Sequence, residues 1–288
     1  MKNLRSMLFM PGNNPGMLVS ADILEADAII YDLEDAVSID QKDAARDLVS
    51  NALKFLEFNN SLVTVRINPI DSPFWKEDIK KILKENLDAI VIPKASVEAV
   101  KTIEKFIEKV CKKENLENKF RFYPLIESTM GILNAKKIAE SSDRIDGLLL
   151  GGEDYCLDLG VYRTKTSKEL AYARYVIAVV AKAYGINAID TPYTDVEDFE
   201  GLIEETKFVK SIGFNGRLIV GPRQVSTVNK IFTPKDDEIE YAKAILKLRD
   251  KAEKEGLGVF SFKGKMVDKP VISRAENLIK AAEERGLI

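Results

Sequence analysis

The 288-residue sequence contains no histidine. This absence excludes the Ser-His-Asp and Cys-His arrangements of nucleophilic catalysis. It also removes imidazole as a zinc ligand and as a proton carrier near neutral pH. Any acid–base chemistry must therefore fall to carboxylates, lysine, tyrosine or an oxygen bound to a metal.

Cysteine is almost as scarce as histidine. The two cysteines, Cys111 and Cys156, have neither the spacing of metal ligands nor that of a disulfide framework. A reducing compartment is the simpler expectation, and we predict a cytoplasmic protein.

Long apolar runs are also lacking. The run Met7–Met10 stops at Pro11 and is too short for the core of a signal peptide. The most apolar helical stretch, Ala171–Tyr184, contains Arg174 and Lys182 and is shorter than the roughly 20 residues of a membrane span. We therefore expect neither secretion nor contact with a membrane.

Charge of one sign is not concentrated anywhere in the chain. The 43 Lys and Arg residues nearly balance the 46 Asp and Glu residues, for a formal net charge of −3. The basic residues are scattered along predicted helix faces, which are usually solvated. Nucleic acid is not expected as a partner.

Eight short apolar runs, each ending abruptly in polar or charged residues, are the main positive signal. They are Ser6–Met10, Ala28–Tyr31, Leu62–Ile67, Ala89–Ile92, Phe122–Ile126, Gly147–Leu150, Asn187–Ile189 and Leu218–Val220. Most are separated by a stretch with helical spacing. Strands that alternate with helices in this way predict an α/β fold, the (β/α)8 TIM barrel.

The pattern changes after the eighth run. A helix is predicted over Asp237–Lys254, an extended stretch with glycines over Gly256–Lys265, and a last helix over Pro270–Arg285. Nothing beyond Lys235 is needed to close a barrel. We therefore predict a barrel over residues 1–234 and a C-terminal helical extension over residues 235–288.

Charged residues follow the predicted strands and should converge on one rim of the barrel. They are Glu34, Asp35, Arg66, Lys94, Glu127, Asp154 and Asp190. So many acids around one arginine and one lysine favour a hard divalent cation held by oxygen ligands. Glu127 and Asp154, placed after consecutive strands, are the predicted metal ligands. In the alternative, Asp154 only caps a turn and Glu127 pairs with Arg66.

Arg66 and Lys94 each allow two interpretations. Arg66 suits the bidentate capture of a substrate carboxylate, but a structural salt bridge to Asp32 or Glu34 is equally supported. Lys94 follows Val-Ile-Pro, and a lysine at a strand end can form a Schiff base with a carbonyl substrate. The rival hypothesis is therefore a metal-free aldolase.

Several motifs together resemble the citrate lyase beta subunit, within the HpcH/HpaI aldolase group that includes malyl-CoA and citramalyl-CoA lyases. They are Arg5-Ser-Met-Leu-Phe-Met-Pro-Gly-Asn13, Asp32-Leu-Glu-Asp-Ala-Val-Ser38 with Lys42 and Ala45-Arg46, Val65-Arg-Ile-Asn68, Ile126-Glu-Ser128, Gly152-Glu-Asp-Tyr155, Gly213-Phe-Asn-Gly216, Pro222-Arg-Gln224 and Gly264-Lys-Met-Val-Asp-Lys-Pro270. The resemblance spans nearly the whole chain, and it rests on the shared order and spacing of the motifs.

The resemblance implies a Mg2+-dependent lyase that cleaves a 3-hydroxyacyl thioester by retro-aldol chemistry. It implies Glu127 and Asp154 as Mg2+ ligands, and contacts from Arg66 and Glu127 to the acid part of the substrate. It further implies a homotrimer or a multiple of it, a thioester carried on CoA or on acyl-carrier protein, and citrate lyase alpha and gamma subunits as partners.

The predicted catalytic residues are Asp268, Arg66, Glu34 and Asp35. The resemblance implies that Asp268 is an acid–base residue donated by the tail of a neighbouring subunit, although an isolated loop aspartate by itself favours an ordinary turn. The predicted substrate-binding residues are Arg66, Glu127, Arg5, Pro11, Gly12, Asn13 and Lys94, with Arg5 and Pro11–Asn13 expected on the same rim as the metal.

Three departures from the citrate lyase beta pattern bear on the substrate. Gly221 stands where those chains typically have asparagine, Ala95 where they tend to have threonine, and Leu157-Asp-Leu-Gly160 where they have Asn-Leu-x-Thr. The implied reaction is the cleavage of a citryl thioester to oxaloacetate and an acetyl thioester. Citramalyl-CoA or malyl-CoA cleavage is the near alternative. The Schiff-base aldolase and a non-catalytic subunit are more remote ones.

Overall fold

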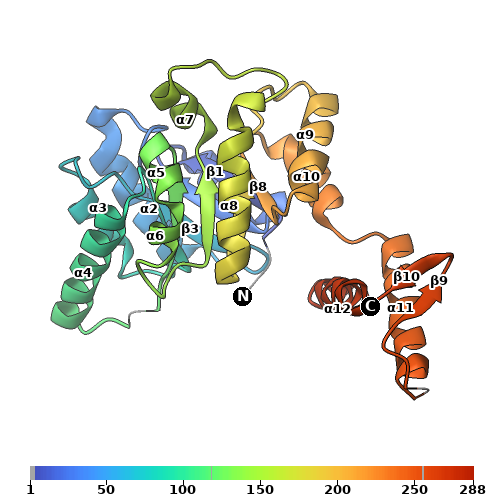
Figure 1. Cartoon of the computed structure of the whole chain (residues 1–288). Coiled ribbons are helices and arrows are strands. Elements are labelled where there is room, and N and C mark those ends of the chain that lie inside the picture. Colours follow the sequence, from blue (N-terminus) through green and yellow to red (C-terminus); the bar gives the residue numbers. More distant parts are fainter. Residues whose placement is uncertain (1–3, 118, 255) are drawn as a thin grey trace. The chain divides into compact units, whose positions relative to one another are not determined.

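The computed structural model describes residues 4–117, 119–254 and 256–288 (Figure 1). The chain forms two compact units, Met1–Lys230 and Ile231–Ile288. The predicted boundary, between residues 234 and 235, falls close to this division.

The first unit is a closed barrel of parallel strands arranged in sequence order. The strands are β1 (Ser6–Pro11), β2 (Ala28–Asp32), β3 (Leu62–Arg66), β4 (Ala89–Ile92), β5 (Arg121–Ile126), β6 (Gly147–Leu150), β7 (Asn187–Asp190) and β8 (Gly216–Ile219). Pairing of β1 with both β2 and β8 closes the barrel. The prediction of a (β/α)8 barrel is confirmed, and all eight apolar runs form strands because such strands are buried on both faces.

Helices connect the strands and surround the barrel (Figure 1). They are α1 (Pro15–Val19), η1 (Ala21–Leu24), η2 (Ile39–Gln41), α2 (Lys42–Phe55), α3 (Trp75–Ile82), α4 (Val97–Glu114), α5 (Thr129–Leu133), α6 (Ala135–Ala139), α7 (Gly152–Leu159), η3 (Lys168–Leu170), α8 (Ala171–Tyr184), α9 (Phe199–Ser211), η4 (Pro222–Gln224) and α10 (Val225–Phe232). The sequence did not predict α7, which starts at a glycine pair that disfavours a helix. This short helix carries Asp154.

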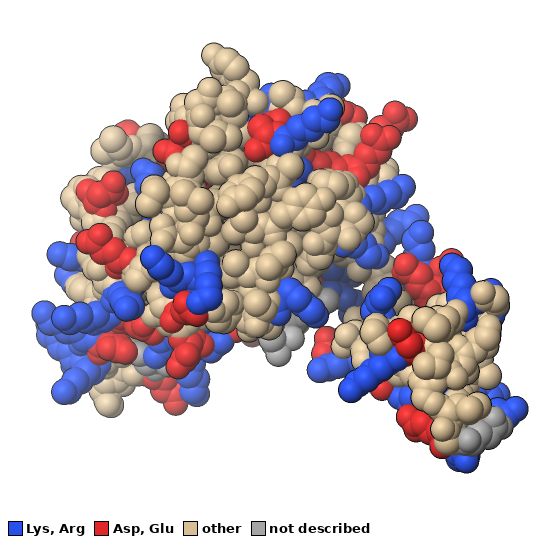
Figure 2. All heavy atoms as spheres, viewed as in Figure 1, with Lys and Arg blue, Asp and Glu red and all other residues tan. Residues whose placement is uncertain are grey.

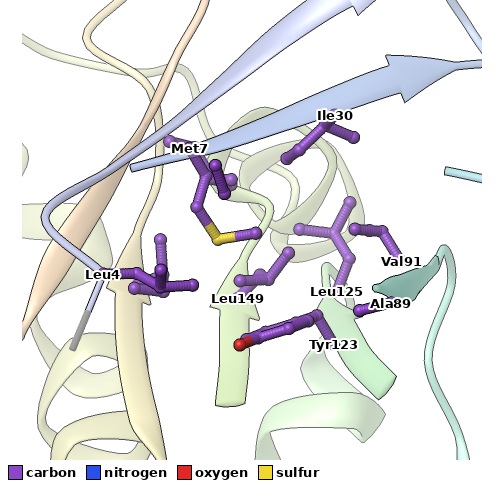
Figure 3. Close-up of a cluster of buried hydrophobic side chains, with 11 residues drawn as sticks. Leu4, Met7, Ile30, Ala89, Val91, Tyr123, Leu125 and Leu149 are labelled. Atoms are coloured by element: carbon purple, nitrogen blue, oxygen red, sulfur yellow. The ribbon is translucent and has the colours of Figure 1, made fainter. Parts of the chain in front are cut away.

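The interior of the barrel is filled with side chains (Figure 3). The buried set comprises Leu4, Met7, Ala28, Ile30, Ala89, Val91, Tyr123, Leu125, Leu149, Ile189 and Leu218. Burying each large apolar side chain stabilises the fold by about 1.5–3 kcal/mol. Because this packing closes the centre of the barrel, room for a ligand remains only at its ends.

The surface of the first unit combines mixed charge with an uncharged area. In Figure 2, positive and negative side chains are interspersed around a tan area over α8. Tyr172, Tyr175 and Val179 of α8 are all exposed. Exposed apolar side chains in a group are typical of surfaces that contact other proteins.

The second unit contains α11 (Asp236–Lys254), the antiparallel hairpin β9 (Phe260–Phe262) and β10 (Lys265–Val267), and α12 (Lys269–Glu283). Lys263 and Gly264 join the two strands with φ values of 48° and 74°, as a tight turn of the hairpin type requires. The small core of this unit is formed by Ala242, Ile245, Val267 and Ala275. The extended stretch predicted from the glycine pattern is therefore a hairpin between two helices.

Across the described ranges, none of the helices combines the length and the apolar character that crossing a membrane requires.

Candidate active site

A cavity of about 340 Å3 opens at the carboxyl ends of the barrel strands. Its lining residues are Phe9, Pro11, Met17, Asp32, Ala36, Arg66, Leu125, Glu127, Gly151, Gly152, Glu153, Asp154, Thr191, Pro192, Leu218 and Val220. Larger hollows of about 660 and 740 Å3 are lined by the segments that lead into the strands, at the opposite end of the barrel. Active sites of this fold lie at the carboxyl ends of the strands, so the smaller cavity is the candidate site.

Glu127 directly follows β5 and is only 6% exposed. Burial raises its pKa to about 7, and the nearby charge of Asp154 contributes to the increase. Its Oε1 atom accepts a short hydrogen bond from the backbone N–H of Lys94. A Cβ atom built on Gly151 would lie 2.6 Å from the Cβ of Glu127, so only glycine leaves room for this side chain.

Lys94 contributes its backbone to the site. Its φ of 45° lies in the left-handed region, an uncommon conformation for a residue with a side chain. The amide is bound to Glu127, while the side chain is exposed. Among the described residues that line the cavity, Lys94 is absent. This geometry gives no support to the Schiff-base hypothesis, which needs the amine inside the cavity.

Asp154 lies in the first turn of α7, where a negative charge interacts favourably with the helix dipole. Glu127 and Asp154 follow the consecutive strands β5 and β6, as predicted, but Asp154 is reached through the start of α7, and both residues line the cavity. The pKa of Asp154 is raised by burial and further by the charge of Asp35, against the effect of Arg66. In the described part of the chain, no group of three or more Asp, Glu, Cys or His residues could hold a metal. The cavity lining contains four carboxylates, of which Asp32 is paired with Arg66 and Glu153 with Arg163. The other two are Glu127 and Asp154.

Arg66 ends β3 and lines the cavity with a side chain that is 11% exposed. Its Nε and Nη2 donate to the two carboxylate oxygens of Asp32 at 2.7 and 2.6 Å. Its Nη1 lies 2.9 Å from Oε2 of Glu34. The structural salt bridge considered from the sequence is therefore present, with both of the acids named. Burial acts to lower the pKa of Arg66, but the two carboxylates outweigh it and raise the pKa.

Glu34 and Asp35 lie behind and beside this arginine. Glu34 is 4% exposed, and burial raises its pKa to about 8 despite the charge of Arg66. The buried ammonium of Lys42 donates to the carbonyl oxygens of Leu33 and Glu34 at 2.7 and 2.6 Å, which fixes this loop. Asp35 is exposed. Neither acid belongs to the described lining of the cavity, so the contacts of Glu34 reach the cavity through Arg66.

Four residues near β1 were predicted to bind substrate. Pro11 lines the cavity, and the N–H of Gly12 donates to the Asp32 carbonyl at 2.8 Å. Asn13 binds the side chain of Gln41. Arg5 precedes β1 and pairs with Asp27, with Nη2 2.6 Å from Oδ1. The expectation that Arg5 shares the rim of Pro11–Asn13 is wrong, because the six residues of β1, at about 3.3 Å each, separate it from that rim.

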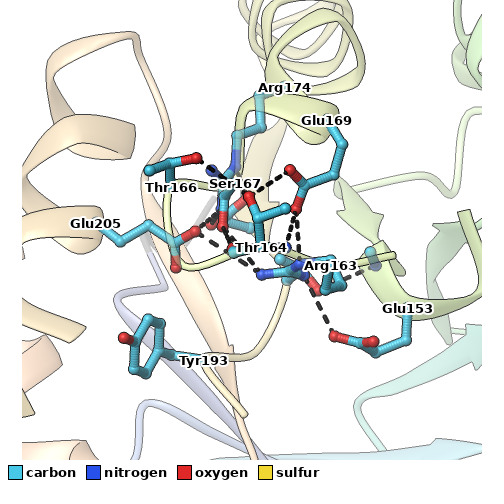
Figure 4. A network of polar contacts seen from close by, with 12 residues as sticks. Glu153, Arg163, Thr164, Thr166, Ser167, Glu169, Arg174, Tyr193 and Glu205 are labelled. Atoms are coloured by element: carbon cyan, nitrogen blue, oxygen red, sulfur yellow. Dashed lines mark hydrogen bonds and ion pairs between the residues drawn. The ribbon is translucent and has the colours of Figure 1, made fainter. Parts of the chain in front are cut away.

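A second group of charges near the ends of β7 and β8 does not open into the cavity. Arg174 donates to both oxygens of Asp190 at 2.9 Å, and Arg217 lies 3.0 Å from the same carboxylate. Both arginines also bind Glu205 of α9, and together they lower its pKa to about 2 against the effect of burial. Figure 4 shows Arg174 and Glu205 within this group. The expectation that Asp190 reaches the mouth is wrong, since it is fully buried and paired.

Sequence reasoning did not identify this group, which we call the closed cluster (Arg174, Asp190, Glu205 and Arg217). Arg174 was interpreted as an interruption in an apolar helix, yet it is 1% exposed. The available signal was a lone arginine on the apolar face of a predicted helix, since such a residue requires a buried carboxylate.

Asp268 belongs to the second unit, where it caps α12. Its side chain accepts a hydrogen bond from the N–H of Val271 at 3.3 Å. Capping of this kind is an ordinary role for an aspartate before a helix. The role of Asp268 as a donated acid–base residue stays a prediction.

The family model described as HpcH/HpaI aldolase/citrate lyase matches residues 5–222. The chain belongs to this family. The family resemblance predicted from the motifs is therefore confirmed, as is the prediction of a lyase.

The similar proteins include both citrate lyase beta subunits and citramalyl-CoA lyases. The citrate lyase subunit beta of Leuconostoc mesenteroides subsp. cremoris is 41% identical, over 99% of this chain and 95% of that one. The mitochondrial citramalyl-CoA lyase of Rattus norvegicus is 30% identical, over 96% of this chain and 86% of that one. Among solved structures, the protein CitE from Mycobacterium tuberculosis in complex with magnesium, acetoacetate and coenzyme A is 28% identical, with a TM-score of 0.80 and 98% of each chain covered.

Proposed function

We propose that this member of the HpcH/HpaI family is a Mg2+-dependent carbon–carbon lyase that cleaves a citryl thioester to oxaloacetate and an acetyl thioester. The observation that carries the proposal is the meeting of two carboxylates, Glu127 and Asp154, with the arginine Arg66 in one cavity. The similarity to citrate lyase beta subunits and to a magnesium complex supports it.

The donor set fits Mg2+. Glu127 and Asp154 come from neighbouring parts of the barrel, and the charge of Asp154 raises the pKa of Glu127. A divalent cation between them would remove this repulsion. Mg2+ characteristically takes one or two carboxylates and completes its shell with water and substrate oxygens. When bound, it would polarise the hydroxyl oxygen of the substrate and favour loss of the hydroxyl proton.

Arg66 would hold the carboxylate of the substrate that becomes the oxo acid. Asp32 and Glu34 fix the guanidinium from behind, which leaves further N–H donors of its five for the cavity. A substrate held by a prepositioned arginine loses little freedom in reaching the reactive geometry. Glu127 and the rim residues Pro11, Gly12, Asn13 and Lys94 complete the proposed binding surface.

Proton transfer to the thioester enolate is the remaining step. As the carbon–carbon bond breaks, its electrons remain on the thioester fragment, and a proton delivered to that carbon gives the acetyl thioester. We assign this proton to Asp268 from the second unit of a neighbouring subunit in a homotrimer. Glu34 and Asp35 stay predicted members of the catalytic group, with Glu34 acting through Arg66.

A mixing experiment tests this assignment. Asp154→Ala and Asp268→Ala chains should each be inactive, and mixing them before assembly should restore part of the activity. A mixed trimer contains some sites with both acids intact. Absence of rescue in verified mixed oligomers would place both residues in the same subunit.

The carrier and the setting of the reaction are part of the proposal. The thioester is taken to be citryl-CoA or citryl acyl-carrier protein, with citrate lyase alpha and gamma subunits as partners in the second case. A cytoplasmic location stays a prediction from the cysteine content.

The proposed function is tested with three substrates and a chelator. Rates with citryl-CoA, citramalyl-CoA and malyl-CoA should be highest with citryl-CoA, should vanish in EDTA and should return with added Mg2+. A higher rate with citramalyl-CoA or malyl-CoA would select the alternative within the same chemistry. Full activity after removal of the metal would overturn the proposal.

Two rival functions give different results in the same assay. A Schiff-base aldolase would be inactivated by borohydride in the presence of pyruvate. A non-catalytic subunit would turn over none of the three thioesters. The exposed side chain of Lys94 argues against the first, and the shared cavity of Glu127, Asp154 and Arg66 argues against the second.

A further inference from the structure

We infer that Arg163 is a positioning residue, which holds the first turn of α7 so that Asp154 faces Glu127. The inference rests on the proposed function, in which Asp154 is a metal ligand. Arg163 lies in the segment between α7 and η3, and its side chain is 14% exposed. In Figure 4 its guanidinium lies among Glu153, Glu169 and Ser167.

Charge, more than hydrogen bonding, holds this guanidinium in place. Carboxylate oxygens of Glu153, Glu169 and Glu205 lie 3.4, 3.5 and 3.8 Å from its Nη1, Nε and Nη2 atoms. One hydrogen bond is present, from Nη2 to Oγ of Ser167 at 3.2 Å. The Nε and Nη1 atoms are buried and have no hydrogen-bond partner among the described residues. The guanidinium is therefore surrounded by three carboxylates, one of which, Glu205, also pairs with Arg174 and Arg217.

The same guanidinium packs against the first residue of α7. A Cβ atom built on Gly152 would lie 2.7 Å from Nη1 of Arg163 and 2.7 Å from Oγ1 of Thr191. The N–H of Gly152 donates to that hydroxyl at 3.0 Å. Gly152 is thus held between the residue after β7 and Arg163, two residues before Asp154. Because the helix starts at a glycine pair, its backbone has unusual freedom, and these contacts restrict it.

Arg163 also connects α7 to the closed cluster. Glu205 pairs with Arg163, and it pairs with Arg174 and Arg217, whose side chains are 1% and 0% exposed. The first turn of α7 is therefore attached, through one carboxylate, to side chains fixed inside the barrel wall. Metal ligands must be held within about 0.5 Å of the productive geometry, and the residues that support them contribute roughly 10–100-fold to metal affinity.

The test measures metal binding directly, with Mn2+ as the probe and electron paramagnetic resonance as the readout. Arg163→Met, which removes the charge, should raise the Mn2+ Kd at least about tenfold. Arg163→Lys should restore part of the affinity, because it keeps the charge without the guanidinium fork. Lys165→Met is the matched control, since Lys165 lies in the same segment, is 83% exposed and should leave the Kd unchanged.

Each outcome decides a separate question. An unchanged Mn2+ Kd in folded Arg163→Met, with folding verified by thermal unfolding, overturns the inference and leaves the proposed function standing. Failure of the unaltered chain to bind Mn2+ contradicts the proposed function and the inference together. If Arg163→Met does not fold, Ser167→Ala decides. That change removes the Nη2 hydrogen bond and should raise the Kd about threefold, and an unchanged Kd would overturn the inference.

Discussion

The barrel holds two groups of buried charges near the carboxyl ends of its strands. In the closed cluster, two arginines neutralise Asp190 and Glu205, and the pKa of Glu205 falls to about 2. At the cavity, the buried cation Arg66 is already paired with Asp32 and Glu34. Burial raises the pKa values of Glu127 and Glu34 to about 7 and about 8, and Arg66 offsets only part of this effect.

The difference shows which property distinguishes a reactive site in this fold. Both groups include buried acids, although Asp154 of the cavity is exposed. Only the cavity has more carboxylate than nearby cation, and only the cavity has room for a ligand. An excess of one charge in a cleft is a stronger sign of function than burial or strand-end position.

Loss of a proposed metal ligand should produce the largest effect, a fall in activity without a matching fall in stability. Glu127→Ala and Asp154→Ala should each lower kcat about a thousandfold or more, because the several kcal/mol of charge stabilisation by the metal disappear. Neither change breaks a buried ion pair, so the thermal unfolding midpoint should move little. A variant with a normal kcat, or one whose thermal unfolding midpoint falls strongly, would contradict the assignment of these two carboxylates to activity and not to stability.

Breaking the closed cluster should affect stability first. Asp190→Asn leaves Arg174 and Arg217 with too little negative charge in the barrel wall, and should cost about 3–5 kcal/mol in the free energy of unfolding. Denaturant unfolding measures this loss. Asp43→Asn is a control, since the Asp43 side chain is 85% exposed although it also pairs with an arginine. Equal effects of the two changes would contradict the account of the closed cluster.

The two groups should also respond oppositely to pH in the metal-free protein. Glu127 and Glu34 have pKa values of about 7 and about 8 in the folded chain, above the ordinary 4.5, so the folded state binds more protons between these values. Their contribution is greatest below pH 4.5 and is lost as the pH rises towards 8. Glu205, with a pKa lowered to about 2, contributes above pH 4.5 and loses this as the pH falls towards 2.

Unfolding free energies measured across this pH range in EDTA check the assignment. Glu127→Gln should reduce the decline between about pH 5 and 7 and leave the part that is due to Glu34. Glu205→Gln should leave the whole decline in place and lower stability above pH 4.5. If Glu127→Gln leaves the slope unchanged, Glu127 does not titrate as described.

The smallest effect is expected at Lys94. Lys94→Met keeps the backbone N–H that binds Glu127, so kcat should stay within about threefold of the unaltered value. Complete loss of activity, together with borohydride trapping of pyruvate, would instead place a reactive amine in the cavity.

The sequence predicted the barrel well because the fold depends on local patterns. Each of the eight apolar runs is long enough to be read alone, and parallel strands buried on both faces leave charge only at their ends. Glu127 and Arg66 could be placed at the cavity for the same reason. Arg5 was misplaced because its motif runs the whole length of β1, and Arg5 lies before the first residue of that strand whereas the rim begins at the last.

What the sequence missed depends on contacts between distant segments. The pairing of Asp190 with Arg174 and Arg217 joins β7, α8 and β8, and no spacing along the chain indicates it. The helix that carries Asp154 was missed because the glycine pair at its start opposes a helix locally. In the folded chain, Arg163 and Thr191 both contact Gly152, the first residue of this helix. These contacts come from other segments, so local sequence does not indicate them.

Glu127 and Asp154 are proposed to hold the metal of a lyase, and anomalous diffraction from crystals of active protein soaked in Mn2+ would locate the ion. We expect a peak in the cavity, coordinated by the carboxylates of both residues. A peak elsewhere, or no ion at these two carboxylates in crystals whose protein is active, would contradict this assignment.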